Sequence, residues 1–583
     1  MKYPTLPEQS SSRQMVDVFK GYNHNLLIGE GEFFDMKNMT SNHYPILAPR
    51  GKRGVYAQPG NPQGLIAKDN LCYIDGSKFV MDGYPIEMGL SIAAEDCPKR
   101  LVSMGAYVII LPDKKYINTL DVTDFGNIEA AFTTSADVTF ELCTIDGVEY
   151  TGITVAAAEP ENPENLDYWI DISSTPHTLK QYSESSGMWV NVATTYIKIS
   201  SPGIGEAFGQ YDGVTISGVK SELLQDLNAS MVVWACDKDY IVVVGILDAV
   251  TTQLATDGAI TVERKMPNMD FVIESENRLW GCRYGVAANG NVVNELYACK
   301  LGDFRNWNCF MGLSTDSYVA SLGTDGQFTG AITHLGYPLF FKEGYVHKVY
   351  GNYPANFQIQ TTACRGVQRG CERSLAIVNE VLYYKARHAV CAYDGSLPTE
   401  ISAVLGEEHY SQAVAGAHGN KYYISMLGSD GQYHLFVCDT GKGMWHKEDN
   451  LPVLAFCSCR EELYAISGGK IITMLGSGMA DSDKVEWMAQ TGIIGTDMPD
   501  MKYISRLLVR MSLEIGARVR FYVQYDSMGG WEHLGTVSGT NLRTFQIPVR
   551  PRRCDHLRLR IEGTGECKIY SITKTIEQGS DVS

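Results

Sequence analysis

Short aromatic segments recur along the middle of this chain at nearly constant spacing. Tyr383, Tyr423 and Tyr464 each lie in a short apolar run that follows a small turn, and they are 40 and 41 residues apart. Phe340 precedes Tyr383 by 43 residues, and Trp280 precedes Phe340 by 60. A period of about 40 to 45 residues, with several short strands in each unit, is typical of β-propeller blades. The spacing therefore predicts a β-propeller.

Asp-Gly pairs mark the turns between the predicted strands, because both residues tolerate a left-handed backbone and favour tight hairpins. Two further units precede the series, at Leu65–Phe79 and Leu101–Ile117, which brings the prediction to about seven blades. Stacked β-sandwiches, which also turn every ~8 to 12 residues, are the alternative fold. The pairs begin at Asp75, Asp82, Asp146, Asp212, Asp257, Asp325, Asp394 and Asp430.

The propeller pattern is interrupted, so the all-β chain divides into five expected parts. Residues 1–55, with scattered prolines and glycines, predict an extended arm. The first blades occupy 56–121, and the remaining blades occupy 231–483. Between them, the acidic segment 122–230 predicts an inserted small β-domain. Alternating apolar and polar residues in 484–583 predict a C-terminal β-sandwich.

Negative charge is concentrated in the inserted segment. The net charge of the chain is −18, and residues 122–230 hold 16 acidic residues against three lysines and no arginine. Residues 484–583 instead hold 14 basic residues against 11 acidic ones. A sequence-specific DNA-binding protein needs a basic face that neutralises phosphates. The charge pattern therefore argues against tight DNA binding.

The 15 cysteines are scattered and form no Cys-x-x-Cys pair, which indicates reduced, buried thiols and neither a disulfide framework nor a zinc site. No apolar run approaches the ~18 residues of a membrane span. The N-terminus lacks the apolar core of a secretion signal. We therefore predict a protein without metal, cofactor or membrane span that folds in the cytoplasm where it is made.

Local signatures of catalysis are absent from the sequence. His-Glu-x-x-His, Gly-x-Ser-x-Gly and the P-loop pattern do not occur. Gly203–Gly209 superficially resembles a dinucleotide-binding loop, but its third glycine is one place late and no βαβ pattern surrounds it. The sequence thus predicts no catalytic, cofactor-binding or metal-binding residues and no enzymatic activity.

Acidic side chains near the start of the inserted segment form the first candidate site. A surface that repels phosphate lets DNA slide past, whereas a basic surface holds DNA by counterion release. We therefore expect part of this segment to face a DNA channel or a basic partner. The candidates are Asp124, Glu129, Asp137, Glu141, Asp146 and Glu149.

Two arginine clusters form the second candidate site. Each is either an anion-binding rim or a patch that pairs with acidic residues at an interface, and the second interpretation is preferred. The repeated Ser-x-Asp-x-Gly-x-Thr-Trp turn of sialidases is missing, which argues against a glycosidase rim. The candidate interface residues are Arg365, Arg369, Arg373, Arg550, Arg552 and Arg553.

Both ends of the chain resemble a known family. The segments Phe19–Asn25, Gly29–Met39 and Tyr44–Gly51 are similar to the opening of tail proteins of short-tailed bacteriophages, called nozzle, tubular or DNA-stabilisation proteins. Near the C-terminus, Arg552–Gly563 and Ile569–Ile572 are similar to the same family. These segments cover a minor part of the chain, and the acidic insertion has no counterpart in the resemblance.

The resemblance implies a non-enzymatic virion component. Such a protein is expected to assemble in the host cytoplasm as a homo-oligomeric ring, a hexamer, in the phage tail. Its expected partners are the portal or adaptor and other tail proteins. Genomic DNA is expected to pass through the ring during ejection without sequence-specific binding. The ring would line or close the DNA channel.

Two other functions remain open at this point. One is a glycan-binding or glycan-cleaving propeller used in host recognition. The other is an intracellular scaffold that uses the propeller rim for protein contacts. A hollow oligomeric ring would favour the phage tail hypothesis over both.

Overall fold

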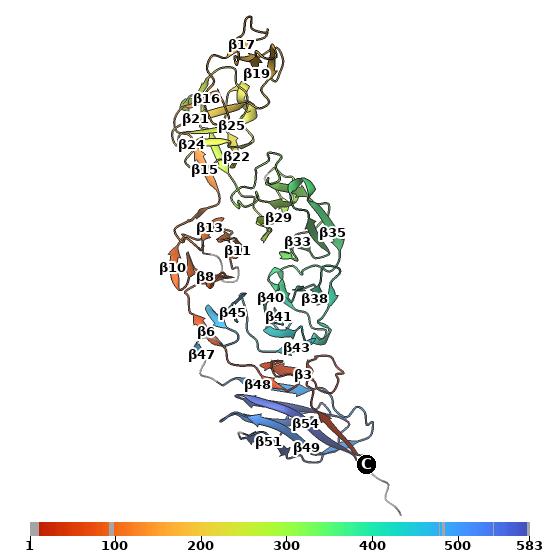
Figure 1. Cartoon of the computed structure of the whole chain (residues 1–583). Coiled ribbons are helices and arrows are strands. Elements are labelled where there is room, and N and C mark those ends of the chain that lie inside the picture. The colour runs from red at the N-terminus through yellow and green to blue at the C-terminus, as the bar shows by residue number, and fades with distance from the viewer. Residues whose placement is uncertain are drawn as a thin grey trace, which may run out of the picture.

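The computed structural model describes residues 11–92, 98–287, 289–476, 479–480, 484–539 and 541–579. In these ranges the regular structure consists of β-strands and five short 3-10 helices. Three parts follow one another along the long axis (Figure 1). An inserted domain lies at the top, a ring of sheets in the middle and a two-sheet sandwich at the bottom. The predicted all-β class is confirmed.

Seven sheets form the middle part within the described residues, and in six of them four antiparallel strands follow one another in sequence. We refer to the seven as the sheet ring. The strands of the six sheets are β7 (Pro62–Ala67), β8 (Leu71–Asp75), β9 (Lys78–Met81) and β10 (Tyr84–Glu87); β11 (Arg100–Met104), β12 (Tyr107–Leu111), β13 (Lys115–Asn118) and β14 (Phe125–Asn127); β28 (Phe271–Ser275), β29 (Arg278–Val286), β30 (Val292–Ala298) and β31 (Tyr318–Ser321); β32 (Gly330–His334), β33 (Tyr337–Lys342), β34 (Tyr345–Tyr350) and β35 (Gln358–Ala363); β36 (Ala376–Val378), β37 (Val381–Lys385), β38 (Val390–Tyr393) and β39 (Thr399–Glu400); and β40 (Ser411–His418), β41 (Lys421–Leu427), β42 (Tyr433–Asp439) and β43 (Met444–Lys447).

The seventh sheet joins the two ends of the ring. It contains β44 (Ala455–Cys459), β45 (Glu462–Ser467), β46 (Lys470–Thr473), the early strand β6 (Gly54–Ala57) and β47 (Met479–Ala480). Because β6 pairs with β46, opening the ring requires breaking a strand ladder. The short helices near the ring are η3 (Pro354–Asn356), η4 (Glu372–Ser374) and η5 (Ala403–Leu405).

Contacts between first strands, with helix η4 bridging one step, run around the whole ring. Strand β7 contacts β11, β11 contacts β28, and β28 contacts β32. Helix η4 contacts both β32 and β40, and β36 contacts β40. The circle is completed because β40 contacts β44 and β44 contacts β7. Four-stranded antiparallel sheets in this arrangement are consistent with a propeller.

The aromatic repeat marks the second strand of five of these sheets. Trp280 lies in β29, Phe340 in β33, Tyr383 in β37, Tyr423 in β41 and Tyr464 in β45. The first four side chains are buried, since second strands are covered on both faces by neighbouring sheets. The spacing in the sequence therefore reflects the length of one sheet plus its connections.

The inserted domain spans residues 130–264, which corrects the expected boundaries 122–230. Strand β14 (Phe125–Asn127) still belongs to the ring, and the apolar run Tyr240–Val244 belongs to the insertion. The strands are β15 (Ala130–Thr133), β16 (Val138–Cys143), β17 (Thr154–Ala156), β18 (Tyr168–Asp171), β19 (Thr178–Ser183), β20 (Met188–Asn191), β21 (Tyr196–Ser200), β22 (Gly213–Ser217), β23 (Ser230–Val232), β24 (Ala235–Asp237), β25 (Tyr240–Val244), β26 (Thr251–Gln253) and β27 (Thr261–Arg264), with helices η1 (Glu222–Leu227) and η2 (Ala255–Asp257).

Three small sheets make up the insertion. Two of them, β15-β27-β22-β23 and β24-β25-β21-β16-β26, enclose one hydrophobic core. The third, β17-β18-β19-β20, lies at the far end of the molecule and is called the tip (Figure 1). Its sheet and Leu142 of β16 share a core with three buried apolar residues, Leu142, Ile170 and Leu179.

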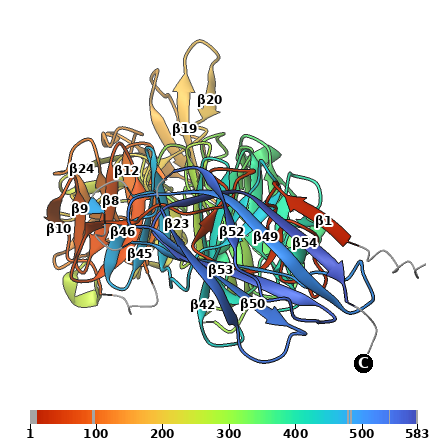
Figure 2. The same cartoon turned by 90° about the horizontal axis from the view of Figure 1, so that it is seen from below.

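The sandwich consists of two sheets with the orders β1-β54-β49-β52 and β2-β3-β48-β53-β50-β51. Figure 2 shows its long strands side by side, with β1 at one edge. Three of the ten strands come from the N-terminal region, so the part of the expected arm that is described is built into sheets. The strands are β1 (Ser11–Val16), β2 (Gly21–Tyr22), β3 (Glu32–Lys37), β48 (Glu486–Thr491), β49 (Lys502–Leu513), β50 (Arg518–Tyr525), β51 (Glu532–Ser538), β52 (Arg543–Ile547), β53 (Leu557–Thr564) and β54 (Cys567–Gln578), and a two-stranded sheet pairs β4 (Met39–Thr40) with β5 (Ala48–Pro49).

One hydrophobic cluster joins the sandwich to the sheet ring. It runs from β33, β37 and β42 of the ring to β48, β49 and β53 of the sandwich. N-terminal side chains fill the joint between them because β2 and β3 also contact β43. The buried N-terminal residues of this cluster are Phe19, Tyr22, Phe33, Met36, Met39 and Leu47.

Candidate functional site

The six acidic candidates do not form one surface. Asp124 accepts hydrogen bonds from the Tyr107 hydroxyl at 2.9 Å and from Asn118 at 3.2 Å, so it stabilises the edge of its own ring sheet. Glu129 pairs with Lys114 at 2.7 Å and accepts the backbone N–H of Met266 at 3.1 Å. Both carboxylates therefore serve contacts within the chain.

Glu141 and Glu149 share one lysine inside the insertion. Lys198 lies 3.0 Å from Glu149, and its ammonium group stands over the Tyr240 ring. Burial, and then the neighbouring Glu149, raise the pKa of Glu141. Of the other candidates, Asp137 accepts the Ala255 N–H at 2.8 Å, and Asp146 is exposed in a turn. Asp146 is therefore the candidate best placed to meet a partner.

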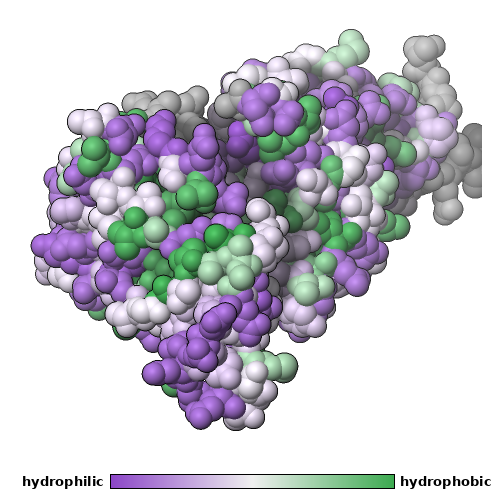
Figure 3. Space-filling view, turned by 90° about the horizontal axis from the view of Figure 1, so that it is seen from above, coloured by the Kyte–Doolittle hydropathy of each residue, from purple (hydrophilic) through white to green (hydrophobic). Residues whose placement is uncertain are grey.

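The tip carries exposed acidic residues that the sequence did not single out. They lie in the loop between β17 and β18 and in the turn between β19 and β20, and the Glu184 N–H bonds to Asn165 so that loop and turn adjoin. None makes an ion pair with a residue that the structure describes. Figure 3, which looks onto this end, shows a mostly hydrophilic surface with small hydrophobic areas. These residues are Glu159, Glu161, Glu164 and Glu184.

A buried polar network fixes the insertion to the sheet ring. The carboxylate of Asp212 pairs with the guanidinium of Arg264 and accepts a hydrogen bond from Asn306 at 2.8 Å. Asn306 belongs to the loop after β30, and its side-chain oxygen accepts the Gly213 N–H at 2.9 Å. All three side chains are at most 7% exposed. The network thus locks two elements of the insertion onto a loop of the ring.

The first arginine cluster is dispersed by the structure. Arg365 is 62% exposed and pairs with Glu400 at 3.1 Å. Arg369 is exposed. Arg373 is turned inward and donates to the carbonyl oxygens of Leu454 and Pro98, both at 3.4 Å, which come from distant parts of the ring. The cluster therefore does not form a single anion-binding rim.

The second arginine cluster lies on an exposed loop of the sandwich. Arg552 pairs with Glu532 at 2.7 Å and stands over the Tyr525 ring at 5.1 Å. Arg550 and Arg553 are exposed on the same loop. The loop is basic and open to solvent, so it remains available for an interface.

A larger basic surface covers the outer face of the six-stranded sheet, which we call the arginine face. Basic residues alternate with core residues along β50 and β53, so they all point outward. Arg560 pairs with Glu562 at 2.7 Å, and Arg558 stands over the Phe34 ring. A cavity of about 220 Å³ opens among Lys37, Arg518, Arg520 and Arg560. The basic residues of the face are Lys37, Arg518, Arg520, Arg558 and Arg560.

The arginine face has a signal in the sequence. Arginines at every second position of an apolar strand must share one side of the sheet. The sequence shows this for Arg558 and Arg560 and again for Arg518 and Arg520. That the two pairs adjoin became visible only from the pairing of β50 with β53.

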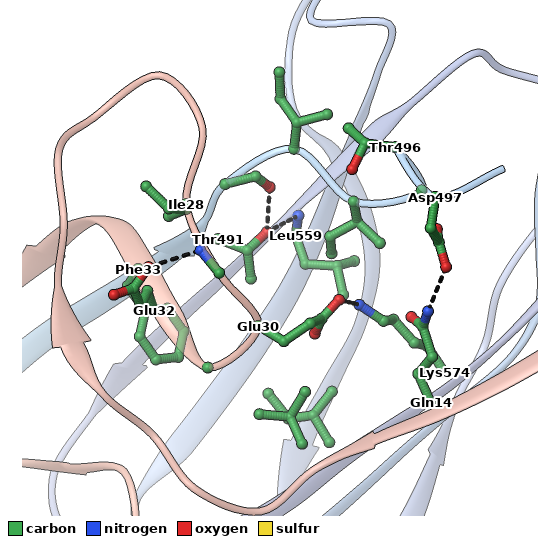
Figure 4. Close-up of a pocket in the computed structure, with 18 of the residues that line it drawn as sticks. Gln14, Ile28, Glu30, Glu32, Phe33, Thr491, Thr496, Asp497, Leu559 and Lys574 are labelled. Carbon is green, nitrogen blue, oxygen red and sulfur yellow. Dashed lines mark hydrogen bonds and ion pairs between the residues drawn. The ribbon is translucent and has the colours of Figure 1, made fainter. Parts of the chain in front are cut away.

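A second cavity, of about 210 Å³, lies between the N-terminal segment and the sandwich (Figure 4). Lys574 points into it from β54, is 2% exposed, and bonds to Glu30 at 2.5 Å. Gln14, which pairs with Lys574 in the β1–β54 ladder, bonds to Asp497 at 2.9 Å on the same side of the cavity. Apolar side chains such as Ile28 line the rest. The cation already has a carboxylate partner, so the Lys574–Glu30 ion pair holds the N-terminal segment against the sandwich.

The cysteines in the described part of the chain are poor nucleophiles. All 14 described cysteines are free thiols, and eleven of them are buried. Burial raises the pKa of each of them, to about 12 for Cys72, so they stay protonated and poorly nucleophilic near neutral pH. No cluster of three or more His, Cys, Asp or Glu side chains suited to a metal ion occurs among the described residues.

Two buried histidines are expected to make the fold sensitive to acid. Burial lowers the pKa of His446 to about 3 and that of His347 to about 4. The unfolded state binds these protons near pH ~6.5, so stability falls as the pH drops below that value, by about 1.4 kcal/mol per unit for each histidine. Denaturant unfolding at pH 7 and pH 5 measures this loss. His446→Gln should lose less stability than the wild type; an equal loss would contradict the assignment.

Within the described residues, no helix has both the length and the hydrophobicity needed to cross a bilayer. No family model and no curated protein matches the sequence.

Several solved structures are similar to parts or all of the chain. The acylaminoacyl peptidase of Pyrococcus horikoshii matches over 50% of this chain and 49% of its own, at 10% identity and a TM-score of 0.24. This chain thus spans about half the length of that peptidase. The exo-β-1,3-galactanase of Phanerochaete chrysosporium matches over 51% of this chain and 95% of its own, at 8% identity and a TM-score of 0.22. The Trypanosoma rangeli sialidase matches over 97% of this chain and 96% of its own, at 9% identity and a TM-score of 0.21. At these TM-scores the similarities carry no argument about activity.

Proposed function

We propose that this protein is a structural subunit of a bacteriophage tail, in which several copies form a ring that lines or closes the DNA ejection channel. In this proposal the sheet ring is a seven-bladed propeller that holds the insertion and the sandwich at its two ends. The subunit has no catalytic role. It contacts the portal or adaptor and other tail proteins, and DNA passes through the assembly.

The position of the N-terminal motif residues carries the proposal. The segments that resemble phage tail proteins contain Phe19, Tyr22, Phe33 and Met36, which are buried in the joint between sandwich and sheet ring. Gly21 has a φ of +87°, and a Cβ there would lie 2.4 Å from the carbonyl oxygen of Trp445. The packing of the sandwich on the sheet ring therefore requires these N-terminal residues. This supports the proposal that the resemblance to phage tail proteins extends to the arrangement of the two parts.

Charge distribution also supports passage of DNA without binding. Outside the tip, the insertion presents the exposed carboxylates of Asp146, Glu222 and Asp226, which make no ion pair with any described residue. Such a surface repels phosphate and lowers friction for a sliding duplex. The arginine face lies at the other end of the molecule, where protein contacts are expected.

Electron microscopy of the purified full-length protein tests the proposal. Closed rings with a central opening are expected, and mass photometry would give their copy number, with six as the expectation. A protein that remains monomeric at micromolar concentration would overturn the proposal. A saturable signal on a glycan array that Arg369→Ala abolishes would favour the host-recognition alternative instead.

A further inference from the structure

We infer that the arginine face of one copy is the docking surface for the acidic tip of a second copy. The inference rests on the proposed ring and deepens it by naming the contact between neighbours. Four observations support it: unpaired arginines on the face, unpaired carboxylates on the tip, exposed apolar side chains beside both, and the separation of the two surfaces within one chain.

The arginine face offers positive charge that the described residues do not neutralise. Glu562 lies opposite Arg520 in the strand register, but its carboxylate is engaged by Arg560 at 2.7 Å. Arg518 and Arg520 are exposed and make no ion pair with any described residue. Their guanidinium groups stand two residues apart on β50, at the rim of the cavity of about 220 Å³. Guanidinium groups favour bidentate contacts with carboxylates.

The tip offers the complementary charge. Glu159, Glu161 and Glu164 are exposed in one loop, and Glu184 is exposed in the adjoining turn. The ion pair that holds the tip sheet internally joins Lys180 to Asp171, at 2.8 Å, and leaves these four carboxylates unengaged. A surface with this charge is attracted to the arginine face and repelled by DNA.

Apolar side chains accompany the charges on both surfaces. Met188 and Val190 lie on the same side of the edge strand β20 and are 61% and 51% exposed. Ile515, three residues before Arg518, is 82% exposed. Burying these residues between two copies would add hydrophobic stabilisation to the charge complementarity. The tip needs such support, because its own core is small.

The two surfaces cannot meet within one chain. They lie at opposite ends of the long axis (Figure 1), and the Asp212, Arg264 and Asn306 network holds the insertion in place. The occupant must therefore be another copy. A contact between different patches of two identical chains is heterologous, and repeating it generates a closed ring when the rotation between copies closes.

Charge reversal on the full-length protein tests the contact. Arg518→Glu combined with Arg520→Glu is expected to weaken self-association by about tenfold or more, measured by analytical ultracentrifugation. Glu161→Lys combined with Glu164→Lys in the tip should weaken it similarly. The protein that carries all four substitutions should recover much of the lost association, because opposite charges face each other again.

A matched control comes from the other sheet of the sandwich. Arg506→Glu combined with Arg510→Glu makes the same charge change on exposed arginines of β49 and should leave association unchanged. Rings that persist in the Arg518 and Arg520 variant, or that weaken equally in the control, would overturn the docking contact and leave the ring proposal standing. A monomeric wild-type protein would overturn both.

Discussion

Replacing Arg53 with methionine is expected to lower the free energy of unfolding by about 3 kcal/mol, because Glu448 and Asp449 then keep only their longer contacts with Arg50. Arg53 lies 2.7 Å from Glu448 and 2.7 Å from Asp449, and the Arg53 and Glu448 side chains are 12% and 8% exposed. Arg50 also reaches Asp449, at 3.3 Å. The network anchors the segment that leads into β6, so its loss should loosen the closure of the sheet ring.

Denaturant unfolding of the full-length protein measures this effect. Arg387→Met is the control, because Arg387 is exposed in a turn after β37 and should change stability by no more than about 0.5 kcal/mol. A loss at Arg53 as small as that of the control would contradict the role of the network. Increased protease cleavage around residues 50–57 would locate the damage at the ring closure.

Replacing Asp212 with alanine should destabilise the attachment of the insertion by a similar amount, about 3 to 5 kcal/mol. The substitution leaves the buried guanidinium of Arg264 without its carboxylate partner and removes one of the two acceptors of the Asn306 amide. We expect a lower melting temperature and faster proteolysis between the insertion and the sheet ring. Small-angle scattering should show a broader distribution of molecular lengths, since the insertion is no longer held at a fixed angle.

Two further variants make the Asp212 result interpretable. Asp146→Ala removes an exposed carboxylate from the same insertion and should be nearly neutral. The combination Asp212→Leu with Arg264→Met removes both charges and should be less damaging than Asp212→Ala, because no buried charge is left unpaired. Equal damage from the pair and the single variant would show that volume, and not charge, dominates the attachment.

The aromatic repeat shows which features of the strands a local sequence pattern predicts. Trp280, Phe340, Tyr383 and Tyr423 mark the second strands of successive sheets because each sheet needs a buried, apolar strand at the same point of its sequence. The apolar run Tyr240–Val244 looks the same in the sequence, yet it pairs with β21 and β24 inside the insertion. No local feature of a buried strand shows which sheet it joins, so the sequence pattern alone places the insertion boundary before this strand.

The candidate sites show the same limit for charged residues. The sequence predicts Glu129 and Arg373 as site residues because they lie in acidic or basic segments. In the structure, both make contacts within the chain. Arg518 and Arg520 form no basic run in the sequence, because a core residue separates them. In the structure they lie on an open surface. Charge in the sequence predicts where polar surface lies; the partners of each charge depend on the fold.

By itself, the sequence determined the all-β class and the repeated four-stranded units, because each follows from residues close together in the chain. Tertiary structure decided which distant segments pair: β6 with β46 to close the ring, and β1 to β3 with the C-terminal strands to complete the sandwich. It also decided that the arginines of β50 and β53 share one face. The physical reason is that strand alternation fixes which side chains point the same way, whereas the neighbouring strand is chosen by burial and backbone hydrogen bonds across hundreds of residues.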